Sequence, residues 1–147
     1  METINFRLDG KIALITGASR GIGEAIAQTL AEYGALCVLV SRKAEALKDV
    51  ADKIQSRGGK AEVIPCHVGD LAQIENLFSQ IRERFGRLDI LINNAATNPY
   101  FGEMAGADEG IWDKTFDVNL KGPFFLIKNA AKLMAESGGG SIVNVSS

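Results

Sequence analysis

The segment Thr16-Gly17-Ala18-Ser19-Arg20-Gly21-Ile22-Gly23 decides the fold, because it joins an apolar run to a stretch of helical period. The run before it, 11–16, has the length and composition of a buried strand, and apolar residues over 22–33 recur at helical spacing. Glycines in such a turn remove Cβ atoms, so a pyrophosphate can lie against the backbone and face the positive helix N-terminus. The segment therefore predicts a phosphate-binding turn between the first strand and the first helix of an α/β protein.

The same alternation of strand and helix continues along the rest of the chain. Expected strands lie at 11–16, 36–40, 61–65, 88–92 and 141–145, and segments of helical period lie at 22–33, 47–54, 71–85 and about 111–136. Apolar strands separated by amphipathic helices indicate a parallel sheet covered on both faces, and right-handed crossovers make it doubly wound. We therefore expect one Rossmann-type α/β domain over 1–147, with its five strands in the order 3-2-1-4-5.

Two local features refine the helix predictions. Asp70, followed three residues later by Gln73, is typical of a helix N-cap. Gly122-Pro123 falls inside the long helix expected at 111–136, and we expect it to bend that helix or to loosen its hydrogen bonding.

Composition excludes several classes of protein. The 147 residues carry 16 basic and 18 acidic side chains, a net charge of −2 that argues against nucleic acid or an anionic membrane as the main partner. No apolar run approaches the length of a membrane span, and 1–11 lacks the apolar core of a signal peptide. One histidine and two cysteines are too few for a typical zinc site, so we expect no metal. We expect Cys37 and Cys66 to be free thiols in a cytoplasmic protein.

Three more motifs follow the glycine turn in a fixed order. They are Asn93-Asn94-Ala95-Ala96 after the fourth strand, Asn119 within Val118-Asn119-Leu120-Lys121-Gly122, and the fifth strand with its end at Ser147. Together the four motifs resemble the short-chain dehydrogenase/reductase family, and most of all its NADP(H)-dependent carbonyl reductases and 3-oxoacyl-acyl-carrier-protein reductases. The resemblance covers nearly the whole chain, with Ala96 standing where the family commonly has glycine.

The resemblance implies an oxidoreductase that transfers hydride between NADP(H) and an alcohol or carbonyl substrate. It assigns catalytic roles to Asn119 and Ser147 and implies no metal. The cofactor-binding residues that it implies are Gly17, Ser19, Arg20, Gly21, Ile22, Gly23, Ser41, Arg42, His67, Val68, Asn93 and Ala95. Relatives associate through the long helix, so the resemblance also implies a homodimer or homotetramer.

The end of the second strand favours NADP(H) over NAD(H). An acidic residue there would hold a ribose 2′-hydroxyl and repel a 2′-phosphate, but this chain has Ser41-Arg42-Lys43. Arg42 and Arg20 can clamp a phosphate by charge-assisted, bidentate hydrogen bonds. The alternative is that Arg42 and Lys43 are solvated residues of a first helical turn, where cations are slightly unfavourable.

One residue departs from the family at the cofactor site. The family commonly has Asp-Val after the third strand, where the carboxylate caps the adenine amino group, and this chain has His67-Val68. His67 can donate a hydrogen bond there, accept one, or stack edge-on. The alternative is an exposed loop histidine, and the sequence leaves both open.

The family's proton donor is the tyrosine of a Tyr-x-x-x-Lys motif, which lies after the serine that corresponds to Ser147. Neither Tyr33 nor Tyr100 is followed by lysine four residues later. We therefore expect the chain to be the N-terminal part of such an enzyme, cut at the end of the fifth strand and inactive alone. We also expect 141–145 to be an exposed apolar edge and the long helix to be partly uncovered.

Two other functions also fit parts of this sequence. The chain can be a nucleotide-binding or regulatory module that associates through these exposed surfaces without catalysis. Gly17-Ala18-Ser19-Arg20-Gly21 also matches the G-x-S-x-G elbow of the α/β-hydrolases. That elbow needs an acid and then a histidine after the serine, but Asp49 and Asp52 fall on a helix ahead of His67, so we set the hydrolase aside.

Overall fold

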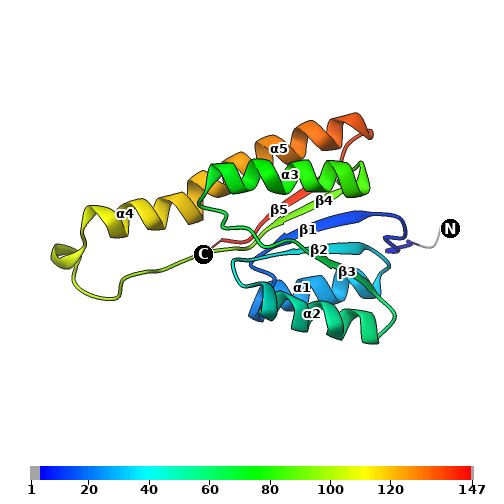
Figure 1. The fold of residues 1–147 in the computed structure, drawn as a ribbon, viewed down its shortest axis with the longest axis horizontal. Helices are drawn as coiled ribbons and strands as arrows, with labels where there is room; N and C mark the ends of the chain where they lie inside the picture. Colours follow the sequence, from blue (N-terminus) through cyan, green and yellow to red (C-terminus); the bar gives the residue numbers. More distant parts are fainter. Residues whose placement is uncertain (1–3, 147) are drawn as a thin grey trace.

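The predicted sheet is present in the computed structural model, which describes residues 4–146 (Figure 1). All strand pairs are parallel, and the order is β3-β2-β1-β4-β5, as the alternating pattern predicts. The strands are β1 Ile12–Thr16, β2 Leu36–Val40, β3 Lys60–Val63, β4 Ile90–Asn93 and β5 Ser141–Asn144. All five residues of β1 are buried, because a central strand with helices on both faces needs apolar side chains in both directions.

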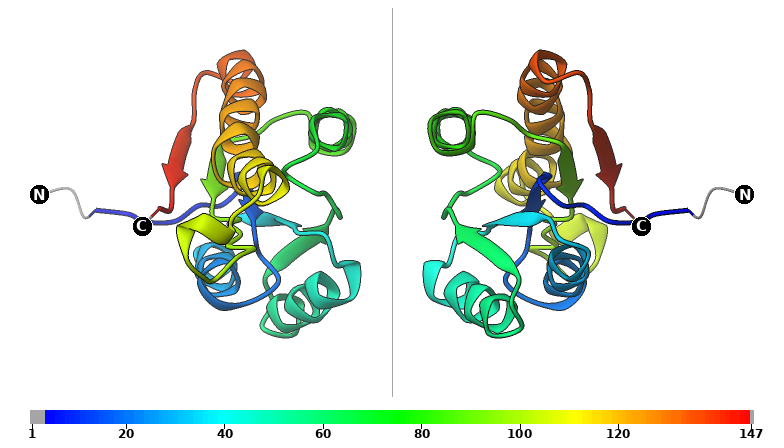
Figure 2. Two further views of the ribbon diagram at one scale, coloured as in Figure 1. Left: turned by 90° about the vertical axis from the view of Figure 1, so that its left-hand side faces the viewer. Right: turned by 90° about the vertical axis from the view of Figure 1, so that its right-hand side faces the viewer.

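Helices cover the two faces of the sheet in pairs. Figures 1 and 2 show α1 and α2 on one face, and α3 and α5 on the other. Their bounds are α1 Gly21–Glu32, α2 Ala44–Ser56, α3 Leu71–Phe85 and α5 Gly122–Glu136. Each pair closes a separate apolar core against the sheet, one around Leu39 and Leu47 and the other around Leu14 and Leu77.

The ends of two elements show how local chemistry sets their bounds. Asp70 caps α3 as predicted, because its Oδ1 accepts hydrogen bonds from the backbone N–H groups of Ala72 and Gln73 at 2.9 and 3.2 Å. Strand β3 ends at Val63, two residues earlier than expected, and is followed by a proline at position 65 that has no N–H for a sheet ladder.

The long helix expected at 111–136 is divided into three parts. Helix α4, Glu109–Phe116, is followed by a π-helical turn, Asp117–Lys121, and then by α5. Pro123 has no N–H to give to the carbonyl of Asn119 in the α-helical register, and the N–H of Gly122 donates to Asp117 five residues back. The prediction that Gly122-Pro123 loosens the helical hydrogen bonding is therefore confirmed.

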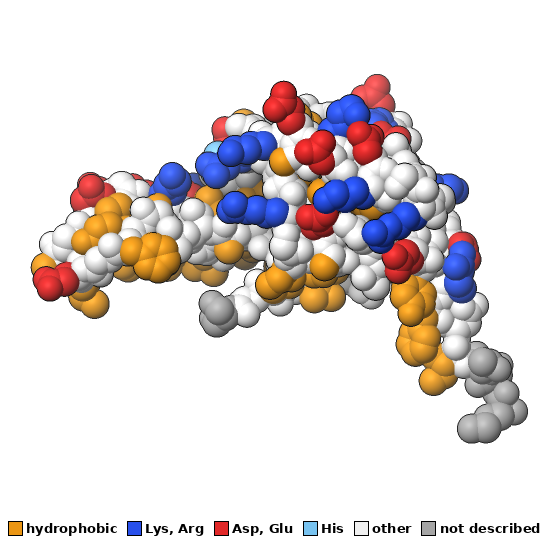
Figure 3. Space-filling view, turned by 90° about the horizontal axis from the view of Figure 1, so that it is seen from below, with side chains coloured by type: hydrophobic (Ala, Val, Ile, Leu, Met, Phe, Trp, Pro, Cys, Tyr) orange, Lys and Arg blue, Asp and Glu red, His pale blue; other side chains and the backbone are white. Residues whose placement is uncertain are grey.

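One side of the molecule carries exposed apolar groups. The loop after β4 and α4 project from the body as an arm (Figure 1), and apolar side chains gather along this arm in Figure 3. Trp112 and Phe124 are 63% and 62% exposed, and Val143 of the edge strand β5 is 48% exposed. The exposed edge and the partly uncovered helix match the expectation from the sequence.

The described residues also bear on the membrane and the cysteines. No helix within residues 4–146 is long and apolar enough to cross a membrane. Cys37 and Cys66 are both buried and unbridged, and burial raises the pKa of Cys37 to about 12 and that of Cys66 to about 11.

Candidate nucleotide site

A groove of about 620 Å³ opens at the carboxyl ends of the strands, on the side where the arm projects. This volume lies in the range of small-molecule sites, and the carboxyl ends of a parallel sheet are where such folds bind ligands. The lining residues follow the carboxyl ends of β1, β2, β3 and β4 or lie on α1, α2, α4 and the π-helical turn. They are Gly17, Ser19, Arg20, Gly21, Ile22, Ser41, Arg42, Lys43, Ala46, Cys66, His67, Val68, Asn94, Ala95, Ala96, Thr97, Lys114 and Val118.

The glycine turn forms the floor of this groove, and its three glycines differ in what would surround an added Cβ atom. Gly17 has φ +63°, and an added Cβ would meet Asn94 Nδ2 at 2.9 Å. Gly23 lies inside α1, where a Cβ would overlap the carbonyl oxygen of Gly17. Gly21 has φ +58° with no atom within 4 Å of an added Cβ, so this side of the turn is open. The turn thus packs tightly on its protein side and leaves a cradle on its open side.

The open side of the turn carries unpaired backbone donors. The N–H groups of Gly21, Ile22 and Gly23 fall in the first turn of α1, where they have no intrahelical acceptor. Arg20, at the N-cap, makes no side-chain capping bond. A helix N-terminus with free N–H groups favours an anion, so the cradle suits a phosphate.

Two residues outside the predicted cofactor-binding set, Thr16 and Asn94, hold this floor in place. Thr16 Oγ1 accepts hydrogen bonds from the N–H groups of Asn94 and Ala95, both at 3.0 Å. Asn94 Nδ2 donates to the carbonyls of Thr16 and Gly17, both at 3.2 Å. These hydrogen bonds join the end of β1 to the end of β4. In the sequence, the only indication of their role is that Thr16 and Asn94 lie within the two motifs quoted above.

The lysine and arginine side chains that line the groove face no acidic residue among the other lining residues. Arg20, Arg42, Lys43 and Lys114 line it, and no aspartate or glutamate does. Within residues 4–146 none of these four side chains has a carboxylate oxygen within 4 Å. In Figure 3 the surface around the pale-blue histidine carries Lys and Arg side chains. An unpaired cluster of this kind attracts an anion with several charges.

The structure brings most of the predicted cofactor residues to this groove. Ten of the twelve line it, and the two that do not are Gly23 and Asn93. Asn93 is 5% exposed on β4, and its Nδ2 donates instead to Asn144 Oδ1 of β5 at 2.9 Å. The groove residues absent from the prediction are Lys43, Ala46, Cys66, Asn94, Ala96, Thr97, Lys114 and Val118.

The two predicted catalytic residues have different outcomes. Asn119 lies on the π-helical turn and clamps the loop after β4, because its Oδ1 accepts from Thr97 N–H and its Nδ2 donates to the Thr97 carbonyl, both at 2.8 Å. Thr97 lines the groove, so Asn119 positions one of its walls. Ser147 lies outside the described residues.

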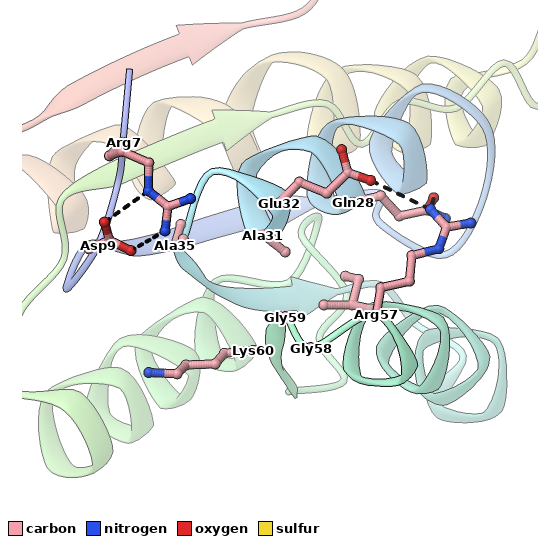
Figure 4. A pocket seen from close by; sticks show the side chains of 12 residues that line it. Arg7, Asp9, Gln28, Ala31, Glu32, Ala35, Arg57, Gly58, Gly59 and Lys60 are labelled. Atoms are coloured by element: carbon pink, nitrogen blue, oxygen red, sulfur yellow. Dashed lines mark hydrogen bonds and ion pairs between the residues drawn. The ribbon is translucent and has the colours of Figure 1, made fainter. Parts of the chain in front are cut away.

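A second hollow, of about 220 Å³, lies at the opposite end of the sheet and is also lined by cations (Figure 4). Here Arg7 hydrogen-bonds Asp9, which holds the pKa of that carboxyl below its usual value. Arg57 lies 3.6 Å from Glu32. Because its arginines are paired and it is smaller than typical ligand sites, this hollow is a weak candidate for an anion site.

The fold and the groove define a class: a doubly wound parallel α/β protein with a glycine-rich turn and a basic groove at the carboxyl end of its first strand. Comparison with known families matches residues 11–147 to the short chain dehydrogenase family. The chain belongs to this family.

Individual relatives agree with that assignment. The chain is 41% identical over 140 residues to the human "Dehydrogenase/reductase SDR family member 4", a match that covers 95% of this chain and 50% of the relative. It is 39% identical over 146 residues to D-threitol dehydrogenase of Mycolicibacterium smegmatis, covering 97% and 55%. The chain therefore spans about half the length of the curated relatives that it matches.

Solved structures give the same result. A metagenomic short-chain oxidoreductase in complex with NADP superposes with a TM-score of 0.92 at 38% identity, over 95% of this chain and 63% of that one. A short-chain type dehydrogenase/reductase from Mycobacterium marinum gives a TM-score of 0.92 at 37% identity, over 97% and 58%.

Proposed function

We propose that this chain is the NADP(H)-binding domain, over 1–147, of an oxidoreductase that interconverts an alcohol and a carbonyl compound. The observation that carries the proposal is the groove wall, where four unpaired cations and no carboxylate surround a glycine cradle. The bound nicotinamide cofactor supplies or accepts the hydride. The complex of one structural relative with NADP supports the choice of cofactor.

The residues divide the binding task by their positions. The free N–H groups at the start of α1 suit the bridging phosphates, because they have no intrahelical acceptor and lie at the positive end of the helix. Arg20 and Arg42 suit a 2′-phosphate, which a guanidinium can hold by two parallel hydrogen bonds. No acidic side chain lines the groove to repel that phosphate.

The test compares one arginine from each end of the sheet. In isothermal titration, Arg42→Ala should weaken NADP⁺ binding by about tenfold or more, the loss of one charge-assisted contact, and leave NAD⁺ binding nearly unchanged. Arg57→Ala, which removes a similar side chain from the paired hollow, should leave both affinities unchanged. Equal affinity of the wild-type protein for NAD⁺ and NADP⁺, or an equal loss for both in Arg42→Ala, would contradict the proposal.

For the reaction, we assign Asn119 a positioning role through Thr97 and give Ser147 the role of orienting the substrate carbonyl. The alternative is a nucleotide-binding or interaction module without catalysis, which the exposed apolar groups on α4 and β5 favour. Residues 1–147 hold no Tyr-x-x-x-Lys motif, so NADPH absorbance with a panel of aldehydes and ketones should show no turnover by this chain, and turnover would contradict the assignment of the proton donor to that motif. The state of the purified chain separates the two functions: a monodisperse chain of 147 residues that binds NADP⁺ favours the module, whereas an insoluble or unfolded one favours a part of a larger oxidoreductase.

We further propose that the exposed apolar residues of α4 and α5 pair with a second copy in a homodimer or homotetramer. Trp112 stacks on Phe116 with ring centroids 4.4 Å apart, and both rings are exposed. Light scattering should show a mass of at least two chains that Phe116→Glu lowers, and a monomeric wild type would contradict this.

The two free, buried thiols support our placement of the protein in the reducing cytoplasm.

A further inference from the structure

The groove wall beside the basic residues contains a histidine whose hydrogen-bonding role is fixed by its own loop. His67 Nδ1 accepts a hydrogen bond from the N–H of Gly69 at 2.9 Å. A backbone N–H can only donate, so Nδ1 carries the lone pair and the proton of the neutral ring lies on Nε2. His67 therefore has a donor, and no acceptor, to offer to anything that binds beside it.

The surrounding contacts hold this arrangement. The N–H of His67 donates to Gln73 Oε1 at 2.8 Å, and its carbonyl accepts from the N–H of Asp70 at 3.0 Å. A Cβ at Gly69 would lie 2.7 Å from the imidazole ring and 3.2 Å from Val118, so glycine is needed for the ring to sit there. The side chain is thus placed by packing and hydrogen bonds, and is more than a solvated loop residue.

The position of His67 in the groove assigns it to the base of the nucleotide, given the proposed NADP(H) function on which this step rests. Arg42 follows β2, so a 2′-phosphate held there puts its nucleoside at the ends of β2 and β3. That part of the wall contains His67 next to the apolar side chains of Val68 and Val118, which are 6% and 8% exposed. Apolar side chains beside one polar group in a groove suit a purine ring.

No carboxylate is available there as an acceptor. Asp70, three residues after His67, is engaged at the N-terminus of α3, where it accepts from Ala72, Gln73 and the Gln73 side chain. Lys114, which also lines the groove, is a donor only. The charged and imidazole side chains around the base therefore offer donors, whereas the exocyclic amino group of adenine needs an acceptor.

We propose that His67 is a specificity residue that meets the base as a hydrogen-bond donor, so that this site does not select a 6-amino purine over a 6-oxo purine. An aspartate at position 67 would do the opposite, because a carboxylate accepts from the amino group and repels an exocyclic oxygen. The identity of residue 67 should therefore control the preference between two cofactors that differ in this exocyclic group and in the proton that the 6-oxo base carries on N1.

The experiment measures the dissociation constants of NADP⁺ and of nicotinamide hypoxanthine dinucleotide phosphate, its 6-oxo analogue, by titration calorimetry at one pH. The wild-type protein should bind the 6-oxo analogue at least as tightly as NADP⁺. His67→Asp should shift the ratio of the two constants by about tenfold toward NADP⁺, the value of one good hydrogen bond. His67→Asn, whose amide oxygen also accepts, should shift the ratio in the same direction by less. Arg42→Ala is the control, since it should weaken both ligands and leave the ratio unchanged.

A ratio that does not respond to either His67 substitution, or a wild-type preference for NADP⁺ of tenfold or more, would overturn the inference alone. Binding of neither nucleotide to the wild type would overturn the proposed function itself. The tautomer has an independent test, because His67 is the single histidine of the chain and its ring nitrogens give unambiguous ¹⁵N resonances. We expect the proton on Nε2, and a proton on Nδ1 would contradict the donor role.

Discussion

The two ends of this sheet contain similar side chains that are arranged in opposite ways. At the carboxyl end, Arg20 and Arg42 line a groove of about 620 Å³ and have no carboxylate partner within the described chain. At the amino end, Arg7 and Arg57 line a hollow of about 220 Å³ and are paired with Asp9 and Glu32 (Figure 4). An arginine whose charge is already satisfied gains little from an anionic ligand, so the unpaired arginines favour the carboxyl-end groove as the proposed anion site.

The glycines show the same contrast. In the first turn at the carboxyl end, Gly17 and Gly23 approach other backbone closely, whereas Gly21 does not. At the amino end, Gly58 and Gly86 have positive φ values but nothing within 4 Å of an added Cβ. The first group serves close packing around a cradle, and the second serves only to turn the chain after a helix.

The largest expected effect is at Gly23. Gly23→Ala should lower the free energy of unfolding by about 3 kcal/mol and abolish NADP⁺ binding, because the added Cβ overlaps the Gly17 carbonyl and lies 2.6 Å from Asn94 Nδ2. Urea denaturation and titration calorimetry measure the two effects. Gly110→Ala is the matched control in α4, where the nearest atom is 3.4 Å away, and it should be neutral or slightly stabilising.

The next effect concerns a buried carboxylate at the amino end. Asp89 is 5% exposed, and it accepts hydrogen bonds from Ile12 N–H at 2.9 Å and from the Arg87 guanidinium at 2.6 and 3.0 Å. Asp89→Asn should lower the free energy of unfolding by about 2 kcal/mol without changing NADP⁺ affinity. A change in affinity comparable to that of Arg42→Ala would show that the two ends are not independent.

This effect should depend on pH with a definite sign. Burial alone would raise the pKa of Asp89, but the hydrogen bonds from Arg87 and Ile12 outweigh it and hold the pKa below its usual value. The stabilisation is therefore complete above the unfolded-state pKa of about 3.9 and is lost as the pH falls through the lower folded-state pKa. The difference in stability between wild type and Asp89→Asn should be constant near neutrality and shrink below about pH 4.

A smaller effect separates the two kinds of turn. Gly21→Ala and Gly58→Ala both place alanine at positive φ, at +58° and +82°, and neither Cβ would meet another atom. Each should cost about 1 kcal/mol of stability in thermal unfolding. Only Gly21→Ala should also weaken NADP⁺ binding, since Gly21 lines the groove. If both variants lose the same NADP⁺ affinity, the loss would come from backbone strain at positive φ and not from a contact in the groove.

The smallest expected difference is in thiol reactivity between Cys66 at the groove wall and Cys37 in the sheet interior. Cys66 lines the groove and Cys37 does not, and burial raises their pKa values to about 11 and about 12. Both thiols should react with iodoacetamide at pH 8 more than a hundredfold slower than an unfolded thiol, with Cys66 faster than Cys37 by up to about tenfold. Rapid labelling of Cys37 in the folded protein would contradict its burial.

The sequence predicted which segments form the site better than it predicted which side chains of those segments face the groove. Periodicity located β4 and the asparagine pair after its apolar run, and the family resemblance assigned Asn93 to the cofactor, whereas the asparagine that lines the groove is Asn94. In the structure Asn93 turns to β5 and Asn94 turns to the glycine turn, because successive side chains along a strand point in opposite directions. Lys114 had no signal at all, since the loop after β4 carries α4 back over the groove from a distant part of the chain.

What the sequence by itself determined is the doubly wound sheet, its family and the glycine-rich turn between β1 and α1. These depend on the local period of apolar residues and on glycine spacing, which neighbouring residues specify among themselves. Only the tertiary structure decided which arginines remain unpaired and which nitrogen of His67 bears the proton. Charge pairing depends on distances between side chains that are far apart in the chain, as for Arg57 and Glu32. The tautomer of His67 depends on the position of the Gly69 N–H. The sequence alone specifies neither of these positions.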